Sequence, residues 1–253
     1  DYILTETSYN KKQNISLYNY IKEYTIDDKH KISTIMDSYI YILESINILL
    51  LKNIVHFNLI ENNILYNLNY NNPIIINFKY SIPINILKNE SFNKYFNIYS
   101  LGYDIWPLEI FVINYLIQNN IIYLNEKEIN NILSKYLSSN TILSLIPLYL
   151  RDKYESQCKD QLNILINKST NNIIEILLTY YKSWDNYSIS ILYLKIINSL
   201  YSEEKPHILV LLSQILIYNL SPIPEERLSV FATQDELQKI FLIEGKIIEK
   251  NKK

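Results

Sequence analysis

Glycine is almost missing from this chain, whose 253 residues contain only Gly102 and Gly245. Glycine-rich nucleotide loops need several closely spaced glycines, because the backbone must approach the phosphates and adopt positive φ angles. Two glycines that lie this far apart in the sequence cannot form such a loop. A glycine-rich phosphate-binding loop is therefore excluded within these residues.

Cysteine and histidine are nearly as scarce. Cys158 is the only cysteine, which excludes an internal disulfide framework and suits a reducing compartment. His30, His56 and His207 are dispersed, without an H-E-x-x-H pattern or a neighbouring cysteine, so we expect no zinc site. The chain also lacks a G-x-S-x-G nucleophile elbow. Neither metal-assisted nor serine hydrolase chemistry is indicated.

Neither sign of charge is in excess, since 24 basic and 26 acidic residues give a net charge of −2 at pH 7. We therefore expect no nucleic-acid partner. The most apolar run, residues 39–55, contains Glu44, Asn47 and Lys52. Charges at bilayer depth are costly, so this run predicts a buried helix and no membrane partner. An intracellular, cytoplasmic protein is expected.

Apolar residues make up 48% of the chain, which predicts a folded globular protein. Ile, Asn, Tyr and Lys are heavily used, and their codons are rich in A and T. We infer an A/T-biased genome, such as that of a parasite or a large DNA virus; a viral protein would lie in the host cytoplasm. Such a bias favours replacement of Asp by Asn, which takes a single G-to-A change.

Apolar residues recur at helical spacing through most of the sequence. Between residues 64 and 76, two short apolar runs flank an Asn-rich turn with Pro73, which predicts a β-hairpin. Thr233-x-x-Glu236 forms a capping box that predicts the start of the last helix. The expected helices cover residues 16–24, 31–52, 104–118, 126–137, 143–153, 160–167, 171–182, 188–201, 206–220 and 233–250.

The motifs on either side of the predicted hairpin are the most informative. Residues 56–63 read H-F-N-L-I-E-N-N, and residues 77–79 read N-F-K. They resemble the active site of a protein kinase, in which H-R-D-L-x-x-x-N of the catalytic loop precedes D-F-G of the metal site. Both essential aspartates of that pattern are asparagines here, Asn58 and Asn77. The resemblance is therefore to a kinase site that has lost its chemistry.

Further segments follow in kinase order. Residues 2–6 resemble the hinge between the kinase lobes, so residues 1–8 are a hinge-like start, with Glu6 and the hairpin residue Leu65 at nucleotide-contacting positions. Residues 104–106 (D-I-W) resemble the D-x-W that opens the central helix of the large lobe. In that motif the aspartate accepts hydrogen bonds from catalytic-loop amides.

Residues 222–229 resemble the P-x-x-R-x-S segment of a late large-lobe helix. Its arginine pairs with a glutamate at the end of the activation segment, which implies an ion pair of Arg227 with Glu90. Residues 120–205 match poorly and are expected to form an enlarged, family-specific helical region. The arrangement resembles the divergent kinase-like proteins of large DNA viruses, and the S-W-D-N-Y run at residues 183–187 adds to that likeness.

The resemblance implies a mainly α fold. It predicts one domain over residues 1–253, with the architecture of a kinase C-terminal lobe and a short β-hairpin between the two motifs. Nothing precedes the hinge-like start, so the glycine loop, the strand lysine and its helix glutamate are missing. We therefore expect the N-terminal lobe to be absent.

The resemblance also assigns roles to the motif residues. Asn58 stands at the position of the catalytic base, where a carboxamide is essentially non-basic. Asn63 keeps one metal contact, whereas Asn77 replaces the carboxylate that holds Mg²⁺ with a weaker ligand. Lys79 stands in place of glycine, and Ile60 in place of the lysine that approaches the phosphoryl group.

Five further residues are expected to be structural. His56 should pack against Phe78, and Asp104 should satisfy loop amides that would otherwise be buried without partners. Trp106 and Arg227 should help to hold the lobe together.

The function that the resemblance implies is that of a pseudokinase: a binding, scaffolding or regulatory module with a protein partner and no cofactor. The alternative is the C-terminal lobe of a divergent active Ser/Thr-type protein kinase, which would use ATP and Mg²⁺. A third reading is an unrelated helical interaction domain, and a fold without a hairpin between Asn63 and Asn77 would favour it. The sequence does not indicate an oligomeric state.

Overall fold

The structure, a computed structural model, describes residues 14–25, 27–87, 92–96 and 104–250, with side chains described up to residue 242. The hinge-like start at residues 1–8, including Glu6, and the expected ion-pair residue Glu90 lie outside this range.

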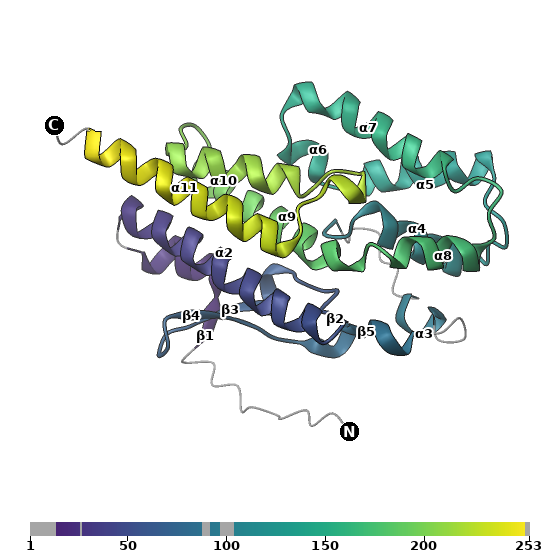
Figure 1. Cartoon of the computed structure of the whole chain (residues 1–253), viewed down its shortest axis with the longest axis horizontal. Coiled ribbons are helices and arrows are strands. Elements are labelled where there is room, and N and C mark those ends of the chain that lie inside the picture. The colour runs from purple at the N-terminus through teal and green to yellow at the C-terminus, as the bar shows by residue number, and fades with distance from the viewer. Residues whose placement is uncertain (1–13, 26, 88–91, 97–103, 251–253) are drawn as a thin grey trace.

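The described chain is mainly helical, as predicted, with two small antiparallel sheets (Figure 1). A π-helical turn over Tyr20–Tyr24 follows the first short helix. The helices are α1 (Leu17–Asn19), α2 (Asp28–Leu51), α3 (Phe92–Phe96), α4 (Leu108–Gln118), α5 (Glu126–Ser139), α6 (Ile142–Leu145), α7 (Leu148–Asn163), α8 (Thr170–Leu178), α9 (Trp184–Leu200), α10 (His207–Tyr218) and α11 (Val230–Lys250). The strands are β1 (Asn14–Ser16), β2 (Ile54–Val55), β3 (Ile64–Asn67), β4 (Asn72–Ile75) and β5 (Ile82–Pro83).

The predicted hairpin is present. Strands β3 and β4 are antiparallel, with Leu65 opposite Ile74, and β1 pairs with the other edge of β3. A second sheet pairs β2 with β5, so that Val55 lies opposite Ile82. Because β2 and β5 flank residues 56–81, their pairing holds the two ends of that segment together. The two motifs are thus brought to the same place beneath α2 (Figure 1).

Asparagine takes the place of glycine at the tight turns of this chain. Positive φ angles need glycine or a residue such as asparagine, whose short polar side chain tolerates the left-handed region. Among the described non-glycine residues, all those with positive φ except Phe57 are asparagines: Asn53, Asn71, Asn77, Asn120 and Asn167. Asn53, Asn120 and Asn167 follow the ends of helices, and Asn71 lies in the hairpin turn. This explains how a chain so poor in glycine still closes its turns.

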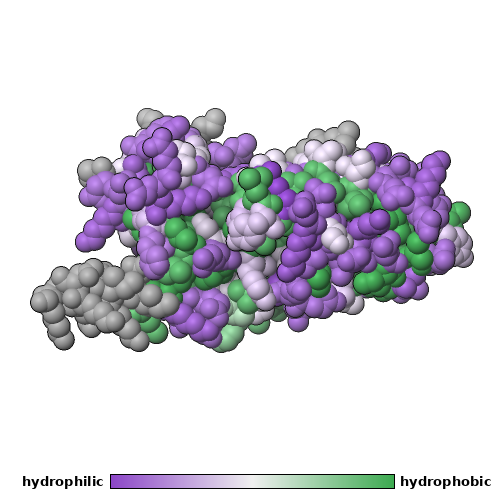
Figure 2. Space-filling model, turned by 90° about the horizontal axis from the view of Figure 1, so that it is seen from above, coloured by the Kyte–Doolittle hydropathy of each residue, from purple (hydrophilic) through white to green (hydrophobic). Residues whose placement is uncertain are grey.

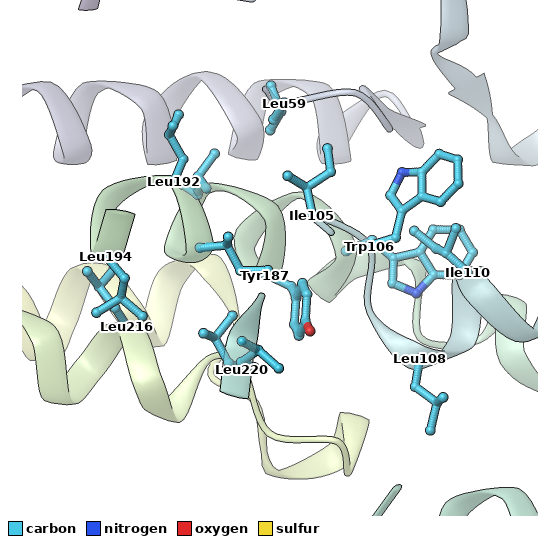
Figure 3. Packing of buried hydrophobic residues seen from close by; sticks show 14 of the residues in the cluster. Leu59, Ile105, Trp106, Leu108, Ile110, Tyr187, Leu192, Leu194, Leu216 and Leu220 are labelled. Atoms are coloured by element: carbon cyan, nitrogen blue, oxygen red, sulfur yellow. The ribbon is translucent and has the colours of Figure 1, made fainter. Parts of the chain in front are cut away.

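Helix α9 is the centre of the fold. Every residue from Trp184 to Leu194 is buried, as expected for a helix surrounded by other elements. It packs against α2, α6 and α10. Figure 3 shows Leu194 of α9 facing Leu216 of α10, and Leu192 near Leu59 of the loop that follows β2. Burying each leucine contributes roughly 1.5–3 kcal/mol of hydrophobic free energy.

Several predicted helix boundaries were wrong. Helix α4 begins at Leu108, after its predicted start, and α9 begins at Trp184, before its predicted start. The sequence also predicted helices at residues 143–153 and 160–167 with a gap between them; the break instead comes at Pro147, and α7 then runs unbroken to Asn163. Proline lacks the N–H that would continue α6, so it separates α6 from α7. The last helix begins at Val230, before the predicted capping box, because Ser229 Oγ accepts the Ala232 N–H at 3.0 Å.

Helix α2 begins at a clear cap, since the Asp27 carboxylate accepts the His30 N–H at 2.7 Å. Its length and apolar composition would suffice to cross a membrane, yet 44% of its most apolar window is buried inside the protein. Its buried face includes Tyr39, whose hydroxyl lies 3.4 Å from Ser190 Oγ of α9. The expectation that the protein has no membrane partner stays a prediction.

Candidate functional site

The loop that follows β2 is anchored to the central helix by one carboxylate. The backbone N–H groups of His56 and Phe57 donate to Asp185 Oδ2 at 2.7 Å and Oδ1 at 3.0 Å. Asp185 lies in the first turn of α9 and is 1% exposed. Burial raises the pKa of Asp185 to about 6, while the two hydrogen bonds oppose that rise. The geometry fixes the start of the 56–63 loop.

The prediction that Asp104 accepts these loop amides was wrong. Asp104 Oδ2 instead accepts hydrogen bonds from Lys195 Nζ at 2.5 Å and Thr141 Oγ1 at 2.6 Å. Only Asp104 fits the D-x-W pattern, because Asp185 is followed two positions later by Tyr187, so the pattern pointed to the wrong aspartate. Asp185 opens a long buried helix, whereas Asp104 lies in a turn.

Trp106 holds the same loop from the other side. Its indole Nε1 donates to the Phe57 carbonyl at 2.9 Å, and the two ring centroids lie 5.0 Å apart. Phe57 has a φ of 69°, which is costly for a bulky residue. The Phe57 N–H donates to Asp185, and the Phe57 carbonyl accepts from Trp106. These two bonds maintain the unfavourable conformation. Trp106 therefore helps to hold this loop in place.

His56 packs against Phe78, as predicted. The rings meet edge to face with centroids 4.8 Å apart, and Phe78 is half-exposed. His56 Nε2 lies 3.0 Å from the Ile76 carbonyl, and Nδ1 lies 3.3 Å from the Asn58 N–H. These partners fit a neutral ring that carries its proton on Nε2. Burial lowers the pKa of His56 to about 4, although the bond to Ile76 opposes this.

The side chains of Asn63 and Asn77 link the two motifs by hydrogen bonds. Asn63 Nδ2 donates to the backbone carbonyl of Asn58 at 2.8 Å, and Asn77 Nδ2 donates to Asn63 Oδ1 at 3.2 Å. Asn58 and Asn63 are buried, and Asn77 adopts the left-handed conformation, with φ 64°. Both polar ends of the Asn63 side chain are therefore engaged within the protein. The Asn77 N–H occupies one of the two lone pairs of Asn63 Oδ1.

The site carries few charges that could perform chemistry. Glu61 is the only carboxylate within residues 56–63, and it is exposed. In the part of the chain that the structure describes, no three His, Cys, Asp or Glu side chains gather as they would around a metal. A cleft of about 420 Å³ lies beside the loop, lined by Glu61 and the paired Asp104 and Lys195. No carboxylate stands at the Asn58 or Asn77 position.

Leu65 lies on β3 and is 6% exposed. A buried leucine in a paired strand needs no ligand to explain it, so its role in nucleotide binding stays a prediction. The same holds for Glu6, which lies outside the described residues.

Within the described residues Arg227 pairs with Glu109, whereas the partner predicted for it, Glu90, lies outside them. Arg227 binds Glu109 through two parallel hydrogen bonds, Nη1 to Oε1 at 2.7 Å and Nη2 to Oε2 at 2.9 Å. The two side chains are 1% and 3% exposed. Arg227 Nε also donates to the Ser221 carbonyl at 2.7 Å, and the guanidinium lies 5.0 Å from the centre of the Tyr187 ring. Glu109 ends the W-P-L-E run at residues 106–109. The comparison with kinases that selected Glu90 did not consider this run.

No protein-family model matches this chain, and neither a curated protein nor a solved structure matches it.

Proposed function

We propose that this chain is a degenerate protein-kinase-like C-terminal lobe that acts as a protein-binding, scaffolding or regulatory module. The observation that carries the proposal is the hydrogen bonding of Asn63 and Asn77. Their side chains stand at the positions at which kinase chemistry needs metal ligands. Here the two side chains bind each other, Asn63 also binds the backbone carbonyl of Asn58, and the surrounding structural contacts are kept.

The retained contacts support the kinase-like part of the proposal. A buried carboxylate, Asp185, receives two loop amides, and His56 packs on Phe78 of the second motif. A buried ion pair joins Glu109 to Arg227, in the segment that resembles P-x-x-R-x-S. The hairpin between the motifs also counts against an unrelated helical domain with chance matches.

The replaced residues support loss of catalysis. A carboxamide at Asn58 forfeits general-base assistance, which contributes roughly 10²–10⁴-fold in rate. Asn77 offers a neutral oxygen or an N–H donor where Mg²⁺ prefers a carboxylate. On this proposal no cofactor is needed, the partner is a protein, and the protein is intracellular and cytoplasmic.

The second candidate is a divergent active kinase lobe that uses ATP and Mg²⁺. The observation that favours it is the survival of the loop frame, with Asn63 and the hairpin residue Leu65 still in place. A loose phosphoryl-transfer transition state demands little general-base help, so Asn58 alone does not exclude activity.

The test is nucleotide binding and phosphoryl transfer by this chain and by any longer protein that contains it. We expect no thermal stabilisation by millimolar Mg·ATP and no Mg²⁺-dependent phosphorylation of protein substrates. Asn77→Asp is the informative variant, because it places a carboxylate against Asn63 Oδ1. Two acceptors then face each other, so this variant should be less stable alone and should regain stability with Mg²⁺. Mg²⁺-dependent phosphorylation by the unchanged protein would overturn the proposal.

A further inference from the structure

A small, mostly apolar cavity lies between α4, α7, α8 and residues 222–225. It has a volume of about 160 Å³, and its apolar wall includes Leu108 and Val112 of α4, Leu162 of α7 and Leu177 of α8. Each of these four side chains is at most 6% exposed. On the face seen from above in Figure 2, exposed apolar side chains lie between hydrophilic ones, which is ordinary for a protein surface. A cavity lined by buried side chains is more specific, because ligand sites are concave and mostly apolar.

The volume of this cavity suits a single six-membered ring. An apolar cavity of about 150 Å³ lined by Leu, Ile and Phe holds a benzene molecule. Pro222 and Pro224 form part of the wall, and proline carries no backbone N–H, so this part of the wall offers no amide donor. Among the described residues that line the cavity, none belongs to the motifs at residues 56–63 and 77–79. The cavity is therefore separate from the candidate site described above.

The charged side chains around the cavity are carboxylates. Glu109 and Glu225 line it, and the described lining contains no lysine, arginine or histidine. Glu109 lies at the positive end of α4, and its charge is balanced because both its oxygens accept hydrogen bonds from Arg227. Glu225 accepts a hydrogen bond from the Tyr180 hydroxyl, and within the described residues no cation lies within ion-pair distance of it. The unbalanced charge of the cavity is therefore negative.

Glu225 lies where the cavity meets solvent. Among the described lining residues, only Glu225 and Ile164 are exposed. The hydrogen bond to Glu225 raises the pKa of Tyr180 to about 12, so the phenol stays protonated and remains a donor. Helices α7 and α8 also end beside the cavity, at Asn163 and Leu178, and helix C-termini carry partial negative charge. The mouth thus favours a cation, and the interior favours an apolar ring.

We propose that this cavity binds a small arylalkylamine, with its ring among the apolar side chains and its ammonium group at Glu225. One ring fills the volume, and a short alkyl chain leads from the ring to the mouth. Glu225 can accept the ammonium group and keep the Tyr180 hydroxyl, because a carboxylate has two acceptor oxygens. The inference goes beyond the proposed kinase-like function and does not rest on it.

The test is binding of phenethylamine to the full chain, measured by isothermal titration calorimetry. Three analogues each change one feature: phenethyl alcohol lacks the charge, hydrocinnamate reverses it, and ethylamine lacks the ring. We expect phenethylamine to bind about tenfold more tightly than each analogue, with its advantage over the alcohol shrinking as salt is added.

Glu225→Gln should abolish the preference for phenethylamine over phenethyl alcohol. Glu226→Gln is the matched control, because Glu226 is the exposed neighbour that does not line the cavity, and it should keep the preference. Val112→Phe fills the cavity and should weaken the amine and the alcohol alike. Ile176→Phe, at a half-buried lining position, replaces that variant if Val112→Phe does not fold.

Binding of phenethylamine no tighter than that of phenethyl alcohol or ethylamine would overturn the inference. A preference for the amine that survives Glu225→Gln would also overturn it, since the ammonium group would then lie elsewhere. Binding that persists in a folded Val112→Phe or Ile176→Phe variant would show that the ring does not enter this cavity.

Discussion

At the scale of single residues, Asp185 binds the loop amides that the sequence assigned to Asp104. Asp185 is buried and accepts two backbone N–H groups, while Asp104 pairs with the partly exposed Lys195. Hydrogen bonds to buried charged groups contribute more than partly solvated ion pairs. In Asp185→Asn the side-chain NH₂ group faces one of the two loop N–H groups. That buried backbone donor then has no acceptor.

Asp185→Asn is therefore expected to lower the free energy of unfolding by about 2–3 kcal/mol. Asp104→Asn is expected to lower it by less than about 1 kcal/mol. Urea unfolding followed by circular dichroism measures both. Equal losses would mean that Asp185 does not anchor the loop as its contacts indicate.

His56 and Asp185 also make opposite contributions to the pH dependence of stability. The pKa of His56 is lowered to about 4 in the folded protein, so its contribution is lost as the pH falls from 6.5 toward 4. The pKa of Asp185 is raised to about 6, so its contribution is present below about 4 and is lost as the pH rises through 6. Each shift corresponds to at most about 3–4 kcal/mol.

The two effects nearly cancel. In the protein without substitutions, this pair should therefore contribute little to the pH dependence of the free energy of unfolding between pH 4 and 6.5. In His56→Gln only the Asp185 effect remains, so the free energy of unfolding should rise as the pH falls through 6. In Asp185→Asn only the His56 effect remains, so the free energy of unfolding should fall as the pH drops below 6.5. Urea unfolding at several pH values measures this, and parallel profiles for the three proteins would contradict it.

At the scale of elements, the Glu109–Arg227 pair joins the start of α4 to the segment between α10 and α11. The two residues are 118 positions apart in the chain, and both are buried. Removing one partner strands a buried charge, which costs far more than an exposed pair contributes.

Glu109→Ala is expected to cost about 3–5 kcal/mol. The double variant Glu109→Leu with Arg227→Met should cost less than Glu109→Ala alone, because no charge is left unpaired. Glu236→Ala breaks the exposed pair with Lys239 and should cost under about 1 kcal/mol. Unfolding free energies of the four proteins decide the matter; a double variant less stable than Glu109→Ala would contradict the argument.

Local patterns predicted the elements well and their long-range partners poorly. The hairpin followed from two short apolar runs around Pro73, and α2 and α10 followed from their helical periodicity. The partner of Arg227 did not follow, because Glu90 and Glu109 both precede it at acceptable distances along the chain. The sequence also did not show whether Asp104 or Asp185 accepts the loop amides. Both answers depend on which segments meet in space, and no local spacing encodes that.

At the scale of the whole molecule, stability is concentrated around α9. It contacts α2, α6 and α10, and it carries the anchor of the 56–63 loop. Leu194 is 1% exposed on this helix, whereas Leu148 of α7 is 76% exposed. Truncating a leucine at the centre leaves a cavity that neighbouring elements cannot easily fill.

Leu194→Ala is expected to lower the free energy of unfolding by about 2–5 kcal/mol. Leu148→Ala should change it by about 0.5 kcal/mol or less, since the side chain is already in water. Chemical unfolding of both variants tests this. A loss at Leu148 as large as that at Leu194 would show that α7 contributes more to the core than its exposure indicates.

The pairing of β2 with β5 has a consequence for engineering. Because those strands hold the two ends of residues 56–81 side by side, the ends of a grafted loop and hairpin would be placed by Val55 and Ile82. The graft must also match its surroundings. It needs two backbone amides where the Asp185 carboxylate can bind them, a carbonyl for the Trp106 indole, and a strand that pairs with β1.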